Sequence, residues 1–143
     1  MANKFLKDKF YPINPAKYVG SYPIVYRSSW EKKLMEMFDR HPDVVSWSSE
    51  SIQIPYYNPV KRIQTVYIPD FIVSYSDGKG KMRAEMIEVK PLDEVPGMPT
   101  AAGKSGRAKM LAQIVNKAKW AAARSFCTKR GIYFRVMTEN QIF

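Results

Sequence analysis

The fold is decided by the stretch Tyr67-Ile68-Pro69-Asp70-Phe71-Ile72-Val73, together with Met86-Ile87-Glu88-Val89-Lys90-Pro91 further along the chain. Both runs are short, apolar and rich in β-branched or aromatic residues, which is typical of β-strands. The segment between them, Ser76-Asp77-Gly78-Lys79-Gly80, consists of turn-forming residues. The sequence therefore predicts that the two runs pair as an antiparallel hairpin.

Three charged side chains interrupt this hairpin: Asp70, Glu88 and Lys90. Because side chains alternate along a strand, Glu88 and Lys90 project from the same face. If Asp70 shares that face, two carboxylates and an ammonium group meet at one point, which suits a hard divalent cation. A structural interpretation stays open for each residue alone, because Asp70 could cap a turn and Glu88 and Lys90 could form a surface ion pair.

Composition narrows the class of protein. The chain has 143 residues, of which 45% are hydrophobic, so we expect a single folded domain. It has neither an apolar run near the ~20 residues of a membrane helix nor a secretory pattern, so we expect an intracellular protein with no membrane contact. The single cysteine, Cys127, excludes an internal disulfide and is expected in the core. Gly103-Lys104-Ser105 resembles the end of a phosphate loop, but Met98 replaces its first glycine, so no nucleoside triphosphate site is predicted.

The net charge of +10 is unevenly distributed. Residues 28–90 hold nine basic and nine acidic side chains, whereas residues 1–27 hold five basic and one acidic, and residues 91–130 hold eight basic and two acidic. This pattern predicts a neutral core between two phosphate-binding surfaces. The alternative is a basic protein without a polyanionic partner.

Residues 1–27 combine prolines, lysines and tyrosines, which predicts an extended arm rather than a helix. Such an arm could bind a nucleic-acid strand, a partner protein or its own domain. Residues 28–143 are expected to form one domain. Its first helix begins at Ser28 and ends before Pro42. Ser28-x-x-Glu31 matches a capping box, in which Glu31 simply bonds back to the backbone.

The middle of the chain reads as strands. We expect one or two strands over residues 44–47 and 51–55, then a loop over residues 56–59. Residues 63–75 read as one long central strand that carries Asp70, with its pairing broken or bulged at Pro69 because proline cannot donate to the ladder.

After Lys90, residues 91–109 read as a long basic loop that could close over a nucleic-acid backbone through Lys104, Arg107 and Lys109. A helix follows from about residue 108 to residue 128, and Lys119 falls at the margin of its apolar face. The residues expected on that face are Leu111, Ile114, Val115, Ala118, Ala122 and Phe126. Residues 132–137 read as a final strand.

Pro69-Asp70 followed by Glu88-x-Lys90 resembles the signature of the PD-(D/E)XK nucleases. The order of elements over residues 28–138 is similar to the αβββαβ core of that restriction-endonuclease-like α/β fold, a mixed sheet flanked by helices. The motifs are similar to those of TnsA-type endonucleases, and the whole chain resembles the head completion proteins of T4-like bacteriophages.

The resemblance implies a Mg²⁺- or Mn²⁺-dependent DNA endonuclease acting in phage head completion or in the processing of DNA ends. Asp70, Glu88 and the carbonyl of Val89 would bind the metal, Glu31 would add a catalytic carboxylate, and Lys90 would position water or offset charge. Double-stranded DNA would be contacted by Lys104, Arg107, Lys109 and Lys119. Phage head or portal proteins would be further partners. The protein would be found in the host cytoplasm or in the virion. The alternative is a structural, DNA-binding virion protein whose nuclease site is vestigial.

Overall fold

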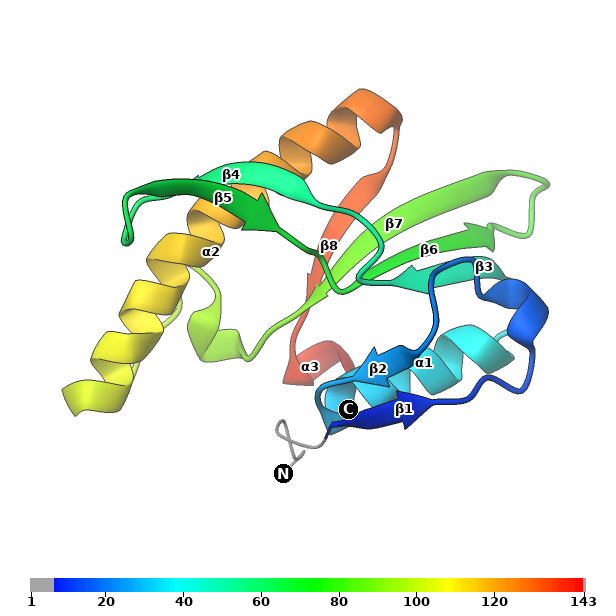
Figure 1. Ribbon diagram of the computed structural model, residues 1–143, viewed down its shortest axis with the longest axis horizontal. Coiled ribbons are helices and arrows are strands. Elements are labelled where there is room, and N and C mark those ends of the chain that lie inside the picture. The colour runs from blue at the N-terminus through cyan, green and yellow to red at the C-terminus, as the bar shows by residue number, and fades with distance from the viewer. Residues whose placement is uncertain (1–6, 143) are drawn as a thin grey trace.

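The computed structural model describes residues 7–142. Its centre is a four-stranded mixed sheet flanked by two helices (Figure 1). In chain order the elements are β1 (Asp8–Phe10), a 3₁₀ turn (Pro15–Lys17), β2 (Ile24–Tyr26), α1 (Ser29–Arg40), β3 (Val44–Ser49), β4 (Ile54–Asn58), β5 (Ile63–Tyr67), β6 (Phe71–Ser76), β7 (Met82–Val89), a 3₁₀ turn (Leu92–Glu94), α2 (Gly103–Arg130), β8 (Tyr133–Met137) and α3 (Glu139–Ile142).

The strand order of the sheet is β3-β6-β7-β8. The first two pairings are antiparallel, and β8 returns parallel to β7 after the α2 crossover. The predicted hairpin is therefore β6–β7, and α1-β3-β6-β7-α2-β8 confirms the predicted αβββαβ core. Within the described residues, no helix is long and apolar enough to cross a membrane.

The sheet separates two apolar clusters. On one face α1 packs Trp30, Leu34 and Phe38 against β3, β6 and β7. On the other face α2 packs Trp120, Ala123 and Cys127 against Met86 of β7 and against the β4–β5 hairpin. Cys127 is buried, as predicted. Because Ile87 and Val89 belong to the first cluster and Met86 to the second, Glu88 faces the α2 side.

The long strand predicted over residues 63–75 is wrong, because the chain leaves one sheet and enters another at Ile68-Pro69-Asp70. Residues 63–67 form β5, which pairs only with β4 among the described residues, and residues 71–76 form β6 of the main sheet. Proline ends the ladder, as expected. The loop predicted over residues 56–59 is also wrong for its first three residues, because residues 56–58 belong to β4 and face the Ile63–Thr65 part of β5.

The long basic loop predicted over residues 91–109 is shorter in the structure. Helix α2 begins at Gly103, so Lys104, Arg107 and Lys109 lie on its first turns rather than in a loop. The beginning of α2 requires two glycines, Gly103 and Gly106, which in the sequence indicated a loop. Gly103 has a φ of 86°, and a Cβ on Gly106 would lie 1.4 Å from the carbonyl oxygen of Ala101.

The apolar face predicted for α2 is correct only in its second half. Leu111 and Ile114 are 50% and 49% exposed. The inward stripe starts with polar residues, because Gln113 donates to the carbonyls of Asp93 and Met98 and Asn116 donates to that of Glu94. The first half of α2 thus packs on the segment after β7, and its tip projects past the sheet (Figure 1).

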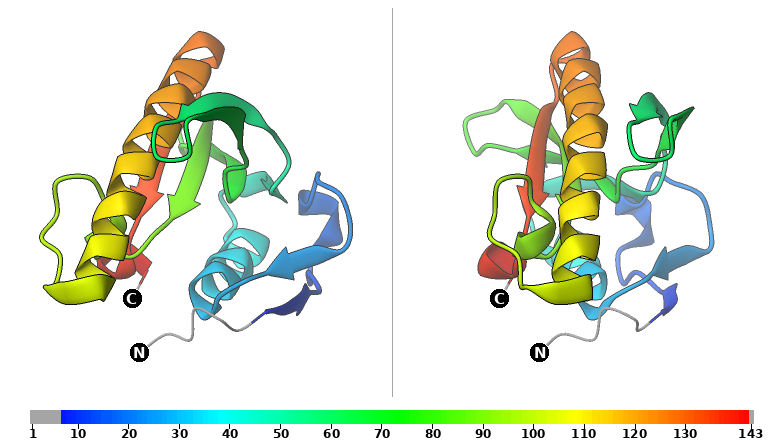
Figure 2. Two further views of the ribbon diagram at one scale, coloured as in Figure 1. Left: turned by 60° about the vertical axis from the view of Figure 1, so that its left-hand side comes forward. Right: turned by 90° about the vertical axis from the view of Figure 1, so that its left-hand side faces the viewer.

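Residues 7–27 of the predicted arm pack on their own domain, and residues 1–6 lie outside the described residues. Strands β1 and β2 pair antiparallel beside α1 (Figures 1 and 2), and Phe10 and Tyr18 pack on Trp47. Asp39 of α1 fixes the arm. Its carboxylate, 1% exposed, accepts 2.8 Å hydrogen bonds from the backbone N–H groups of Ile13 and Asn14. The boundary at residue 27 remains a prediction.

Replacing Asp39 with alanine should loosen the arm. The change leaves two backbone donors without their acceptor, so we expect it to lower the free energy of unfolding by about 2–4 kcal/mol. Urea unfolding measures this loss, and limited proteolysis should cut near residues 11–14 sooner. Asp43→Ala, at an exposed residue beyond the end of the same helix, is the control. Equal stability of the two variants would contradict the role given to Asp39.

Candidate active site

Asp70 and Glu88 meet where the β6–β7 ladder ends. Phe71 pairs with Ile87, so the same register continued by one residue brings Asp70 opposite Glu88. The N–H of Val89 donates a 2.7 Å hydrogen bond to the Asp70 carboxylate. The two carboxyl groups therefore lie on one face of the hairpin, and Lys90 follows on the same face by alternation.

The two carboxyl groups form a coupled, buried pair. Glu88 is only 3% exposed. Burial raises the pKa of Asp70 well above its usual value, and the neighbouring charge of Glu88 raises it further. Burial also raises the pKa of Glu88, although Lys90 and a hydrogen bond with Asp70 oppose this. Two carboxylates this close do not both ionise easily without a cation, so a bound cation would favour the ionised form of the pair.

Glu31 lies near this pair but is held separately. Its N–H donates to the Ser28 hydroxyl at 3.1 Å, and its carboxylate accepts from the N–H of Arg27 at 3.3 Å, so it does bond back to the backbone. Burial raises the pKa of Glu31 to about 7, and the charge of Asp70 adds to the effect. Glu31 is therefore both part of the helix start and electrostatically linked to the site.

Sequence reasoning missed two tyrosines in the site. Tyr67, the last residue of β5, is 3% exposed, and its buried hydroxyl lies beside the Glu88 carboxylate. Its pKa is raised by burial and then by the charges of Glu88 and Asp70, so the hydroxyl faces the carboxylates. The Lys119 ammonium stands over the rings of Tyr56 and Tyr67, 6.0 and 5.5 Å from their centres. In the sequence these tyrosines look like ordinary apolar residues of a strand, and no motif indicates that they belong to a site.

Lys119 belongs to the site, in contrast to the other three predicted DNA contacts. Its pKa is lowered by burial and by the charge of Lys90. Lys104 and Arg107 are exposed on the first turns of α2. The Lys109 ammonium is 2.6 Å from the Glu94 carboxylate and 3.3 Å from that of Asp93, so its charge is already compensated.

A groove of about 350 Å³ gives access to the carboxylates. Its floor contains Asp70 and Glu88, and one wall is the β4–β5 hairpin. Three lysines from three different elements line it: Lys61, Lys90 and Lys119. The arrangement places positive charge around a pair of buried oxygen ligands, which suits a bound metal ion and a phosphate chain.

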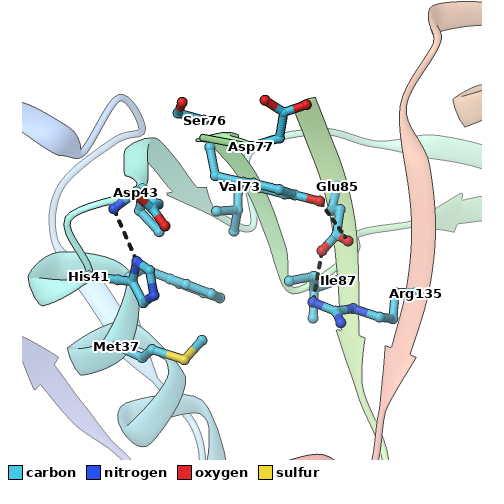
Figure 3. Close-up of a pocket in the computed structure, with 12 residues that line it drawn as sticks. Met37, His41, Asp43, Val73, Ser76, Asp77, Glu85, Ile87 and Arg135 are labelled. Carbon is cyan, nitrogen blue, oxygen red and sulfur yellow. Dashed lines mark hydrogen bonds and ion pairs between the residues drawn. The ribbon is translucent and has the colours of Figure 1, made fainter. Parts of the chain in front are cut away.

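A larger cavity, of about 420 Å³, lies on the α1 face of the sheet (Figure 3). Its charged groups are occupied with one another, because Arg135 donates to Glu85 at 2.8 Å and Tyr75 donates to Glu85 at 3.2 Å. His41, the only histidine, accepts from the N–H of Asp43 at 3.0 Å. The Glu85 and Arg135 charges neutralise one another, and this cavity contains no buried pair of carboxyl groups, so the groove beside Glu88 is the better candidate despite its smaller volume.

Among residues 7–142, no three His, Cys, Asp or Glu side chains lie close enough to hold one metal ion together. Asp70 and Glu88 are therefore a two-carboxylate site, and Glu31 is an outlying third carboxylate. Mg²⁺ commonly binds one or two carboxylates and takes its remaining ligands from water and phosphate. The geometry is compatible with that mode of binding.

Comparison with known proteins agrees with this geometry. The sequence model of the family described as "TnsA-like endonuclease N terminal" matches residues 41–139. The chain belongs to the TnsA-like endonuclease family. It is also 37% identical, over 139 residues, to the head completion nuclease of Enterobacteria phage T4, a match that covers 92% of this chain and 90% of that protein.

The family match includes Asp70, Glu88, Lys90 and Lys119, whereas Glu31 precedes it. The restriction-endonuclease-like fold expected from the sequence is therefore the fold of this chain. The roles of the individual site residues remain predictions.

The raised pKa of Glu31 predicts a stability that depends on pH. The folded state holds a proton on Glu31 up to about pH 7, whereas the unfolded chain loses it near 4.5, so stability falls as pH rises through this range. The loss should not exceed about 3 kcal/mol. Glu31→Gln keeps an oxygen for the Arg27 N–H but does not titrate. Urea unfolding in EDTA at pH 5 to 8 should show a shallower pH dependence in this variant, and parallel curves would refute the assignment.

Proposed function

We propose that this chain is a divalent-metal-dependent endonuclease that hydrolyses phosphodiester bonds in double-stranded DNA. Its membership of the TnsA-like endonuclease family supports nuclease chemistry in general. The observation that carries the finer proposal is the buried Asp70–Glu88 pair on the floor of a groove lined by lysines. The carboxylate pair alone would repel the phosphate at this point, so cleavage requires a cation between the carboxylates and the phosphate that is cut.

The residues fit a hard cation. Asp70 and Glu88 provide carboxylate oxygens, the carbonyl of Val89 is the third candidate ligand, and the hydroxyl of Tyr67 lies beside Glu88. Mg²⁺ or Mn²⁺ is the expected ion, because the donors are all oxygens. When bound, it would supply a Lewis acid that activates water and offsets the charge of the phosphate.

The chain's own residues would do the remaining work. The Lys90 ammonium would donate hydrogen bonds to a phosphate oxygen and stabilise the negative charge that grows during attack by water. Glu31, whose pKa is about 7, would be partly ionised at neutral pH and able to accept the proton of the attacking water. Water would add to phosphorus as the bond to the leaving sugar oxygen breaks.

The biological setting follows from the relative. A protein named as a head completion nuclease supports a role for this chain in completing phage heads, through the processing of DNA ends inside the infected cell. Binding to head or portal proteins, and incorporation in the virion, are part of the same proposal. A purely structural role remains the alternative if the site does not cleave.

Asp70→Ala should abolish cleavage but not DNA binding. It removes one metal ligand and leaves the basic groove intact, so the Mg²⁺-dependent rate of nicking supercoiled plasmid should fall at least about 100-fold. Glu85→Gln is the matched control, because it neutralises an acid on the same strand β7 that lines the cavity on the opposite face. A wild-type protein inert with Mg²⁺ and Mn²⁺, or an equally active Asp70→Ala, would defeat the proposal.

Metal binding should stabilise the protein more strongly at higher pH. The pKa values of Asp70 and Glu88 are raised by burial, so an ion competes with a proton for this site, and the competition weakens as pH rises. Millimolar Mn²⁺ should therefore raise Tm more at pH 8 than at pH 6. The shift should vanish in Glu88→Gln, and a shift that is the same at both pH values would contradict this site.

A further inference from the structure

The β4–β5 hairpin stands outside the αβββαβ core and forms one wall of the groove. It is inserted between β3 and β6, which are neighbours in the main sheet, so the core does not require it. We propose that this hairpin is a DNA-backbone clamp, in which Lys61 and Arg62 at its tip bind phosphates of the strand that lies in the groove. The inference deepens the proposed function, because it names the part of the chain that holds that function's substrate.

The charges of the tip are available. Lys61 and Arg62 are exposed, and neither forms an ion pair within residues 7–142. Other basic residues of the chain, such as Arg27, Arg83 and Arg135, are paired with acids. Lys61 lines the groove together with Lys90 and Lys119, so positive charge continues from the hairpin tip to the carboxylates. A continuous basic track is what a sugar–phosphate chain follows.

The tip is held in one shape. The buried side chain of Asn58 accepts 3.0 Å hydrogen bonds from the N–H groups of both Val60 and Lys61. Below the tip, Tyr56 and Tyr67 pack the hairpin against α2 in the second apolar cluster. A rigid tip presents its charges without a large loss of conformational entropy on binding.

Arg62 occupies a strained backbone position. Its φ is 55°, in the left-handed region that glycine adopts freely and other residues adopt at a cost. An arginine at this position therefore does not serve the turn, and strained residues of this kind concentrate at binding sites. The turn itself does not need the exposed side chain of Arg62, so we assign that side chain a role in binding.

The reach of the hairpin fits DNA. The five residues of β5 rise by ~3.3 Å each, which places the tip roughly 16 Å from the end of the strand beside Asp70. DNA advances ~3.4 Å per nucleotide, so the tip would contact the backbone about five nucleotides from the carboxylates. Within residues 7–142 one edge of β5 is unpaired, and Ile63, Val66 and the following Ile68 are exposed. These features would suit an added peptide strand, but the charges along the groove favour a polyanion.

The test is binding of a fluorescein-labelled 30-base-pair duplex in EDTA, measured by anisotropy from 50 to 200 mM NaCl. Each phosphate contact removed should lower the slope of log K against log[NaCl] by about 1, so Lys61→Ala/Arg62→Ala should lower it by about 2 and weaken binding about tenfold. Arg62→Gly alone should lower the slope by about 1 while Tm is unchanged or higher, because glycine relieves the strained φ.

The matched control is Lys79→Ala/Lys81→Ala. It removes the same charge from exposed lysines at the tip of the β6–β7 hairpin, at the opposite end of the molecule (Figure 1). Its salt slope should equal that of the wild type. If both double variants lose the same amount of DNA affinity, the effect is due to net charge alone. If Lys61→Ala/Arg62→Ala loses no affinity, the hairpin does not clamp DNA. Either result overturns the proposal.

Two further outcomes separate this proposal from others. If the hairpin variants keep DNA affinity but lose binding to head or portal proteins, the edge of β5 is a peptide site and the clamp is wrong. Because binding is measured in EDTA, it does not depend on catalysis. If DNA binding requires Lys61 and Arg62 but the wild-type protein cleaves no DNA, the nuclease proposal alone is refuted. If the protein cleaves DNA and neither residue affects DNA binding, the clamp alone is refuted.

Discussion

The site depends on one hydrogen bond at the end of the β6–β7 ladder, from the Val89 N–H to the Asp70 carboxylate. Pro69 has no N–H, so regular pairing stops there and the next residue is free to turn its side chain toward β7. The bond fixes that side chain opposite Glu88. A break in the sheet thus positions a functional group, and the same break redirects the chain from the small β4–β5 sheet into the main one.

Burial on the α2 side gives the carboxyl pair its chemistry. Tyr67 and Trp120 exclude water from the same apolar cluster that contains Met86, next to Glu88 in the chain. In such surroundings two carboxylates are costly, and the cost is lowest when a cation or a proton is present. The protein therefore keeps a poorly compensated charge at the point where a basic groove opens, which is characteristic of a site that binds a ligand.

The sequence was sufficient for the core and for Asp70 and Glu88, because apolar alternation and turn residues determine strand direction and face. It was insufficient where polar residues point inward. Gln113 and Asn116 look exposed by composition but bond to backbone carbonyls, so the apolar residues Leu111 and Ile114 were assigned to the wrong side. Tyr56 and Tyr67 were missed because their place beside Lys119 depends on two elements far apart in the sequence.

The parallel pairing of β7 with β8 has a consequence for synthesis. The strand that carries Glu88 remains at the edge of the sheet until residues 133–137 have left the ribosome. Until then its unpaired N–H and C=O groups are open to other chains, and the main-chain partner of the Lys90 N–H, the carbonyl of Met137, does not yet exist. Nascent chains should therefore be both catalytically incomplete and prone to association. Both conditions should end when β8 pairs with β7.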